Sequence, residues 1–219
     1  MRRTQRGLDR FIFFTDAVAA VAITLLVLPL VDSVNEIGAS GGNLPEWLAE
    51  NWSRLLVFAI SFAITGLFWM LHHRFSELLV DYNLGLMWLN LGWMFTIVCL
   101  PLATELLNLD DTGLAPIAYI ATMVACSVLT VLMRWMCVRE PQLVRDRAAV
   151  VAGLRANLVT VALFVVALAV TIAFPAVGTW TLFILLLTPV LTRLFGLRGD
   201  MVGGDGAGGG EQSKGAPED

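Results

Sequence analysis

Long runs of apolar residues, separated by short polar segments, dominate this chain of 219 residues. A helix needs about 20 mostly apolar residues to cross the hydrocarbon core of a bilayer. The runs of sufficient length predict an all-α integral membrane domain with six transmembrane helices in residues 1–198. The predicted helices are Phe11–Val31, Leu55–Leu79, Leu84–Leu107, Leu114–Val138, Leu154–Phe174 and Val177–Phe195.

The polar segments between these runs predict the connections. Gly38–Gly42 with Pro45 indicates the first loop, Asn108–Gly113 a turn, and Arg139–Arg155 a polar connector. Residues 199–219 are Gly-rich and polar without apolar periodicity, which is typical of a disordered tail. The composition agrees, because 58% of the chain is hydrophobic and only 15% charged. Soluble domains contain about 45–50% apolar and about 25% charged residues.

Basic and acidic residues gather at opposite ends of the six predicted helices. Basic residues flank membrane helices on the cytoplasmic side. We therefore expect both termini to be cytoplasmic and Asn35–Glu50 to be external. The residues on the basic side are Arg2, Arg3, Arg6, Arg10, His72, His73, Arg74, Arg134, Arg139, Arg145, Arg147, Arg155, Arg193 and Arg198. The other side carries Arg54 with Asp32, Glu36, Glu46, Glu50, Glu105, Asp110 and Asp111.

Hydrogen-bonding side chains occur at similar depth near the basic ends of the first three predicted helices. Asp16 lies on the first, Trp69, His72 and His73 on the second, and Asn90 on the third. Ionisable groups inside a bilayer are costly and normally face the protein interior. We interpret these residues as a polar network that joins three helices. A direct role in moving ions or protons stays open as the alternative.

Metal and cofactor sites are not predicted from this set. His72 and His73 are adjacent in sequence, so they point about 100° apart on a helix and are poorly placed to share one ion. The three cysteines, in apolar runs, show no CxxC or Cys/His spacing. We therefore expect no cofactor and no enzymatic activity.

The remainder of the first predicted helix carries an aliphatic stripe. Val21, Leu25 and Leu28 follow an i, i+4, i+7 spacing, and Thr24 borders them. Such a stripe is compatible with ordinary packing or contact with lipid. It is also compatible with a hydrophobic constriction, which gates a pore by excluding water.

Three sequence patterns, taken together, resemble the transmembrane protein 175 family of lysosomal potassium channels and their prokaryotic relatives. The first helix matches the family's RxxxFSD signature, with threonine in place of the usual serine. The second helix is similar to its W-x-x-H-x-R pattern, and the third to its LLxLN and LP elements. The matching residues are Arg10, Phe14, Thr15 and Asp16, then Trp69, His72 and Arg74, then Leu86–Leu91 with Leu100 and Pro101.

This resemblance implies a potassium-selective channel subunit in a bacterial or archaeal cell membrane, with potassium ions as the permeant species. Prokaryotic members with one six-helix unit form homotetramers, in which the first helix lines the pore. The family's constriction maps onto Val21, Leu25 and Leu28, with Thr24 beside the pore and a valine where a bulkier side chain is usual. Arg10, Thr15 and Asp16 of the signature are expected to be structural anchors around the pore helix. Trp69, His72 and Asn90 are expected to form the polar network.

Two other classes of function compete with a channel. A proton-coupled secondary transporter would use Asp16 and His72 as a relay, but the chain shows no convincing internal repeat or pair of broken helices. An intramembrane enzyme or haem protein is disfavoured, because the chain has no nucleophile motif and its only histidines are adjacent.

Overall fold

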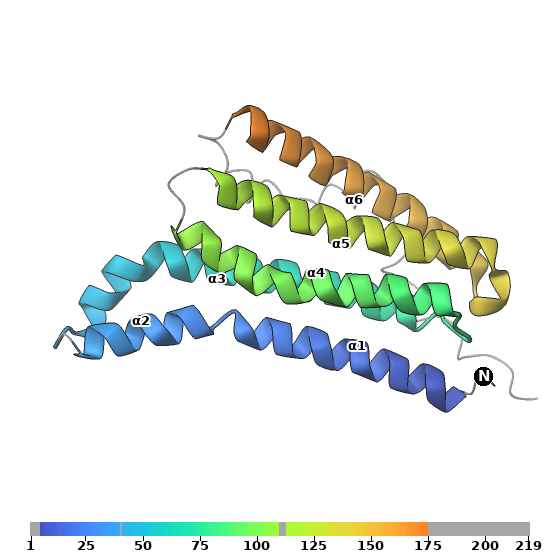
Figure 1. Ribbon diagram of the computed structural model, residues 1–219, viewed down its shortest axis with the longest axis horizontal. Helices are drawn as coiled ribbons and strands as arrows, with labels where there is room; N and C mark the ends of the chain where they lie inside the picture. Colours follow the sequence, from blue (N-terminus) through green and yellow to red (C-terminus); the bar gives the residue numbers. More distant parts are fainter. Residues whose placement is uncertain (1–4, 40, 110–112, 175–219) are drawn as a thin grey trace, which may run out of the picture.

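The computed structural model describes residues 5–39, 41–109 and 113–174. The predicted sixth helix, Val177–Phe195, and the predicted tail, 199–219, lie outside the described residues. The described part consists of helices packed side by side (Figure 1). They are α1 (Gln5–Leu25), α2 (Leu28–Ala39), α3 (Leu44–Ser76), α4 (Leu84–Leu109), α5 (Leu114–Arg139), the 3₁₀ turn η1 (Pro141–Leu143) and α6 (Arg147–Ala173).

These helices include five candidate membrane spans within the described residues, by length and hydropathy. The first candidate span, Arg6–Ala39, comprises α1 and α2, and α3 to α6 provide the other four. The expectation of an all-α, multi-pass membrane protein is confirmed at this level.

The first predicted helix is divided in the structure. The sequence predicted one helix over Phe11–Val31, but α1 ends at Leu25 and α2 begins at Leu28. Pro29 explains the break, because proline has no N–H to bond the carbonyl of Leu25 and its ring clashes with that carbonyl. The chain instead closes a tight turn, in which the Val27 N–H bonds the Thr24 carbonyl at 3.4 Å.

The segment between the first two predicted helices, residues 32–54, is largely helical, while Gly41 and Gly42 of the predicted first loop lie outside the helices. α2 continues to Ala39, and α3 begins at Leu44, so Pro45 lies in the first turn of a helix. Gly41, at φ 78°, takes the left-handed conformation that glycine favours. Asn43 and Glu46 form a capping box, in which each side chain accepts a hydrogen bond at 3.2 Å from the other residue's backbone.

The length of α3 explains why its N-terminal part is polar. Its 33 residues span about 50 Å, whereas a hydrocarbon core is about 30 Å thick. The helix therefore extends beyond the core, where its first turns pack against α2. Trp47 contributes to this packing, because its Nε1 donates to the Ser33 hydroxyl at 3.1 Å. The polar residues at the start of α3 indicate that this part of the helix is exposed to water. Exposure to water does not require a loop.

The predicted polar connector Arg139–Arg155 is also largely helical. α6 begins at Arg147, eight residues earlier than Arg155, the end of the predicted connector. Asp146 caps it by accepting a hydrogen bond from the Ala149 N–H at 3.0 Å. Arg155 is exposed, so the helix carries this charge on its outer side.

The α3–α4 and α5–α6 connections meet at one end of the bundle, where α1 also begins (Figure 1). The N–H groups of Val80 and Arg145 each bond a carbonyl of the other connection, those of Leu143 and Leu78, at 2.9 Å. Leu143 is fully buried beneath this pairing. The pairing holds the ends of α3 and α5 together, directly below the polar residues described next.

Candidate functional site

A chain of hydrogen bonds joins α1, α3 and α4 through Asn90. The Asn90 Nδ2 donates to the Thr15 hydroxyl at 2.7 Å, and the Asn90 Oδ1 lies 2.8 Å from the His72 Nε2. All three side chains are buried, with exposed fractions of 3% or less. One asparagine on α4 therefore bonds to both α1 and α3.

The donor and acceptor roles in this series of hydrogen bonds follow from the Thr15 hydroxyl. The Thr15 hydroxyl donates to the Phe11 carbonyl at 3.0 Å, so its oxygen must accept from the amide of Asn90. The Asn90 oxygen then faces His72, and the matching tautomer carries its proton on Nε2. The Ser76 hydroxyl donates to the His72 carbonyl at 3.0 Å and lies 3.3 Å from the other ring nitrogen, Nδ1.

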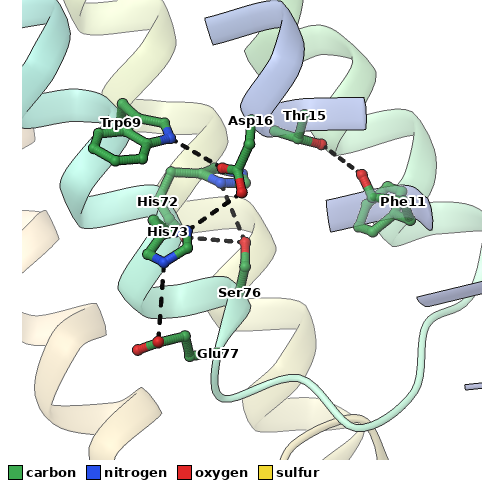
Figure 2. A network of polar contacts seen from close by, with 8 residues as sticks. All are labelled: Phe11, Thr15, Asp16, Trp69, His72, His73, Ser76 and Glu77. Atoms are coloured by element: carbon green, nitrogen blue, oxygen red, sulfur yellow. Dashed lines mark hydrogen bonds and ion pairs between the residues drawn. The ribbon is translucent and has the colours of Figure 1, made fainter. Parts of the chain in front are cut away.

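Asp16 makes a second link between α1 and α3, beside the first. Its carboxylate accepts a hydrogen bond from the Trp69 Nε1 at 2.9 Å and lies 3.4 Å from the His73 Nδ1 (Figure 2). The His73 Nε2 is 3.9 Å from Glu77 on the other side. His73 is 40% exposed and Asp16 27%, so this group borders the surface of the single chain.

The two histidines therefore have different surroundings. His72 is buried and bonds Asn90, whereas the half-exposed His73 faces Asp16. The Trp93 ring covers His72, with 3.9 Å between ring centroids. A proton relay from Asp16 to His72 would therefore require proton transfer between the contacts around Asp16 and the separate hydrogen bonds around His72. Within the described residues, no group of three His, Cys, Asp or Glu side chains is placed to hold a metal ion.

The four signature residues are divided between the interior and the surface. Thr15 and Asp16 contribute the two links, while Arg10 and Phe14 are exposed on the single chain. Asp16 therefore has a partner on another helix, as expected for an ionisable group inside the membrane. Arg10, in contrast, points away from the helices of its own chain.

The predicted constriction residues lie on the uncovered face of α1 and at the start of α2. Val21 is 58% exposed, Leu25 38% and Leu28 50%, and Thr24 is exposed beside them. The Thr24 hydroxyl donates to the Val21 carbonyl at 2.8 Å, which leaves its oxygen able to accept or to approach a cation. Because the helix breaks after Leu25, Leu28 belongs to α2 and is not on the same continuous helix as the other two.

Two contributors to the buried chain were missed from the sequence. Ser76 lies four residues after His72, and Trp93 three residues after Asn90, so each follows its partner by about one helical turn. That spacing was available as a signal. The contact of Trp93 with His72 was not, since it depends on how α3 packs against α4.

Residues 10–101 match the family model described as endosomal/lysosomal potassium channel TMEM175. This segment of the chain is therefore similar to the TMEM175 family. The TMEM175 segment contains α1 from Arg10, α2, α3 and α4 as far as Pro101, and thus both links described above. The resemblance indicated by the signature residues is confirmed.

Two curated relatives of this chain carry the name potassium channel. One, from Chryseobacterium sp. (strain P1-3), is 32% identical over 105 residues, which are 48% of this chain and 51% of the relative. The other, from Streptomyces collinus, is 30% identical over 139 residues, which are 61% of this chain and 66% of the relative. The matched parts therefore span about half of one relative and just under two thirds of the other.

Solved structures with the same fold extend beyond the matched segment. The crystal structure of a lysosomal potassium-selective channel TMEM175 homolog from Chamaesiphon Minutus has a TM-score of 0.69. It is 23% identical, and the match covers 90% of this chain and all of that one. A variant of the potassium channel MtTMEM175, solved with a nanobody fusion, gives 0.58 at 20% identity, with 85% and 91% covered. These similarities show that the fold is shared along most of the chain.

Proposed function

We propose that this chain is one subunit of a potassium-selective channel whose pore is lined by α1. The observation that carries the proposal is the apolar, uncovered face of α1 within the TMEM175 segment. Thr15, Ala19 and Ala22 pack inward with exposed fractions of 1% or less, while Val21 and Leu25 project outward. The names of the two relatives, potassium channel, support the same conclusion.

In this proposal four copies bring their α1 helices together around the ion path. Val21, Leu25 and Leu28 form an apolar neck that excludes bulk water until it widens. Potassium holds its hydration water less tightly than sodium, so potassium loses less on entering such a neck. The Thr24 hydroxyls, which border the stripe, compensate part of that loss. Neither a carbonyl-lined filter nor a cofactor is required.

The complete subunit in this proposal has six transmembrane helices in residues 1–198, followed by a tail. Both termini are cytoplasmic. Support comes from the end of the bundle where α1 begins and the two connections pair, because the exposed arginines Arg139, Arg145 and Arg147 lie there. The turn between α2 and α3 is then external. A cysteine introduced at Ala39 should react with an impermeant thiol reagent from outside the cell, and one at Gln142 only after the membrane is opened.

The decisive experiment measures current in planar bilayers with purified protein under opposing potassium and sodium gradients. A channel gives unitary steps and a reversal potential displaced towards the potassium equilibrium potential. A carrier using Asp16 and His72 gives no unitary steps, and its flux depends on a proton gradient. Native mass spectrometry of the same sample tests the tetramer, and a dominant dimer would contradict that part of the proposal.

A further inference from the structure

The connector between α5 and α6 presents arginines that the proposed pore does not use. Arg139 ends α5, while Arg145 and Arg147 flank Asp146, the N-cap of α6, and all three arginines are exposed. Because α5 and α6 are both candidate spans, the connector between them lies at a membrane surface. These charges are therefore at the depth of lipid headgroups.

An aromatic side chain holds the first of these arginines in place. The guanidinium carbon of Arg139 lies 3.8 Å from the centroid of the Trp135 ring. Trp135 is 43% exposed and precedes Arg139 by one helical turn, so the ring faces outward along the last turn of α5. Tryptophan is enriched where membrane and water meet. Trp135 covers one side of the Arg139 guanidinium, whose N–H groups are donors that suit the oxygens of a phosphate.

The acidic residues of the same connector are occupied by hydrogen bonds of the protein itself. Glu140 accepts from the Asn83 Nδ2 at 2.9 Å and from the Gln142 Nε2 at 3.3 Å. Asp146 caps α6 by accepting from the Ala149 N–H. These carboxylates consequently satisfy donors of the protein, whereas the three guanidinium groups remain exposed.

The backbone of the connector is also fixed before any lipid binds. Residues 143–145 pair with the α3–α4 connection, and Leu143 and Val144 are buried. A site on a fixed backbone loses little conformational entropy when a ligand binds.

From these observations we infer that Arg139, stacked on Trp135, and the neighbouring Arg145 and Arg147 form a binding surface for the phosphate headgroup of an anionic membrane lipid. The lipid's acyl chains would lie along the apolar outer surface of α5, which includes Leu132 and Val128. The ligand is a lipid in the bilayer, not a free phosphate ion.

The test uses the full chain in bilayer nanodiscs of phosphatidylcholine with or without phosphatidylglycerol, followed by mild detergent extraction. The measured quantity is the ratio of the two lipids that remain bound. A basic residue beside anionic lipid strengthens binding about five-fold, so Arg139→Gln, Arg145→Gln and Arg147→Gln together should lower the enrichment on the order of 100-fold at low salt. Arg54→Gln, at the other end of the bundle, serves as the control and should leave it unchanged.

Two further measurements distinguish a lipid site from diffuse charge attraction and from a site for free phosphate. Trp135→Leu keeps every charge and should lower the phosphatidylglycerol enrichment several-fold. Because Trp135 is exposed, this variant tests the lipid site if the triple variant does not fold. Added inorganic phosphate should not displace the lipid. Unchanged phosphatidylglycerol enrichment in correctly assembled variants, an equal loss in Arg54→Gln, or displacement by inorganic phosphate would each overturn the inference.

Discussion

The face of α1 that carries Thr15 and Ala19 is buried against α3 and α4, whereas the face that carries Val21 and Leu25 is exposed on the single chain. The buried face is joined to its neighbours by directional hydrogen bonds, whereas the exposed face carries mainly apolar side chains, with Thr24 beside them. The comparison teaches that one helix can be fixed in orientation by one side and leave the other side free. In the proposed channel, substitutions on the two faces should therefore fail in different ways.

The largest effect is expected from removing the residue that joins the three helices. In Asn90→Ala the buried His72 Nε2–H loses its acceptor, and an unsatisfied buried polar group costs about 1–3 kcal/mol. Gel filtration should show loss of assembly, and unfolding in detergent should occur at a clearly lower temperature. His72→Ala and Asp16→Ala should likewise affect assembly more than ion preference.

Asn108→Ala is the matched control for that experiment, because Asn108 is on the same helix and donates to the nearby Glu105 at 3.3 Å. It should assemble normally. A well-assembled Asn90→Ala protein with only its ion preference altered would show that the polar network contacts ions directly.

On the exposed face, a polar residue at Leu25 should change conduction while leaving assembly intact. Leu25→Asn makes the proposed neck wettable, so current should rise several-fold and the reversal potential should move away from the potassium equilibrium value. Leu102→Asn is the control, since Leu102 is 64% exposed but lies on α4. Equal effects at both positions would remove the distinction between α1 and any other exposed apolar surface.

A larger side chain at the same face should have the opposite effect. Val21→Phe adds bulk where four copies would converge, so the unitary current should fall while the reversal potential keeps its potassium preference. Single-channel recording separates this from a loss of protein at the membrane, because the latter reduces the number of steps and not their size. Unchanged unitary current would mean that Val21 does not line the narrow part of the path.

Hydrophobic length predicted the helices well where the apolar runs end sharply. The predicted third and fourth helices both begin where α4 and α5 begin, at Leu84 and Leu114. Hydrophobic length gave wrong boundaries where helices leave the membrane, as at the start of α3 and of α6. Charged residues there are compatible with a solvated helix as well as with a loop, and only the caps at Asn43 and Asp146 distinguish the two.

The candidate site could be predicted as a set of residues but not as a set of pairs. Depth along the helices placed Asp16, Trp69, His72 and Asn90 together, and these residues do make contacts across α1, α3 and α4. Which histidine faces Asp16 depends on the rotation of α3 about its axis, and periodicity does not supply that rotation. Pro29 is a signal for the break before Leu28, but a proline near the end of an apolar run is equally compatible with a simple helix end.

The smallest expected effect concerns the hydroxyl of Thr15 and tests the order of the hydrogen-bond chain. Thr15→Ser keeps the hydroxyl that accepts from Asn90, whereas Thr15→Val keeps the shape and removes the oxygen. Hydrogen bonds between membrane helices average about 0.6 kcal/mol, so Thr15→Val should lower stability by about that amount or more, and Thr15→Ser by less. Unfolding in detergent measures both against the parent chain. If Thr15→Val is as stable as Thr15→Ser, the bond from Asn90 to α1 contributes nothing measurable, and packing of Ala19 and Ala22 alone would fix the orientation of the helix.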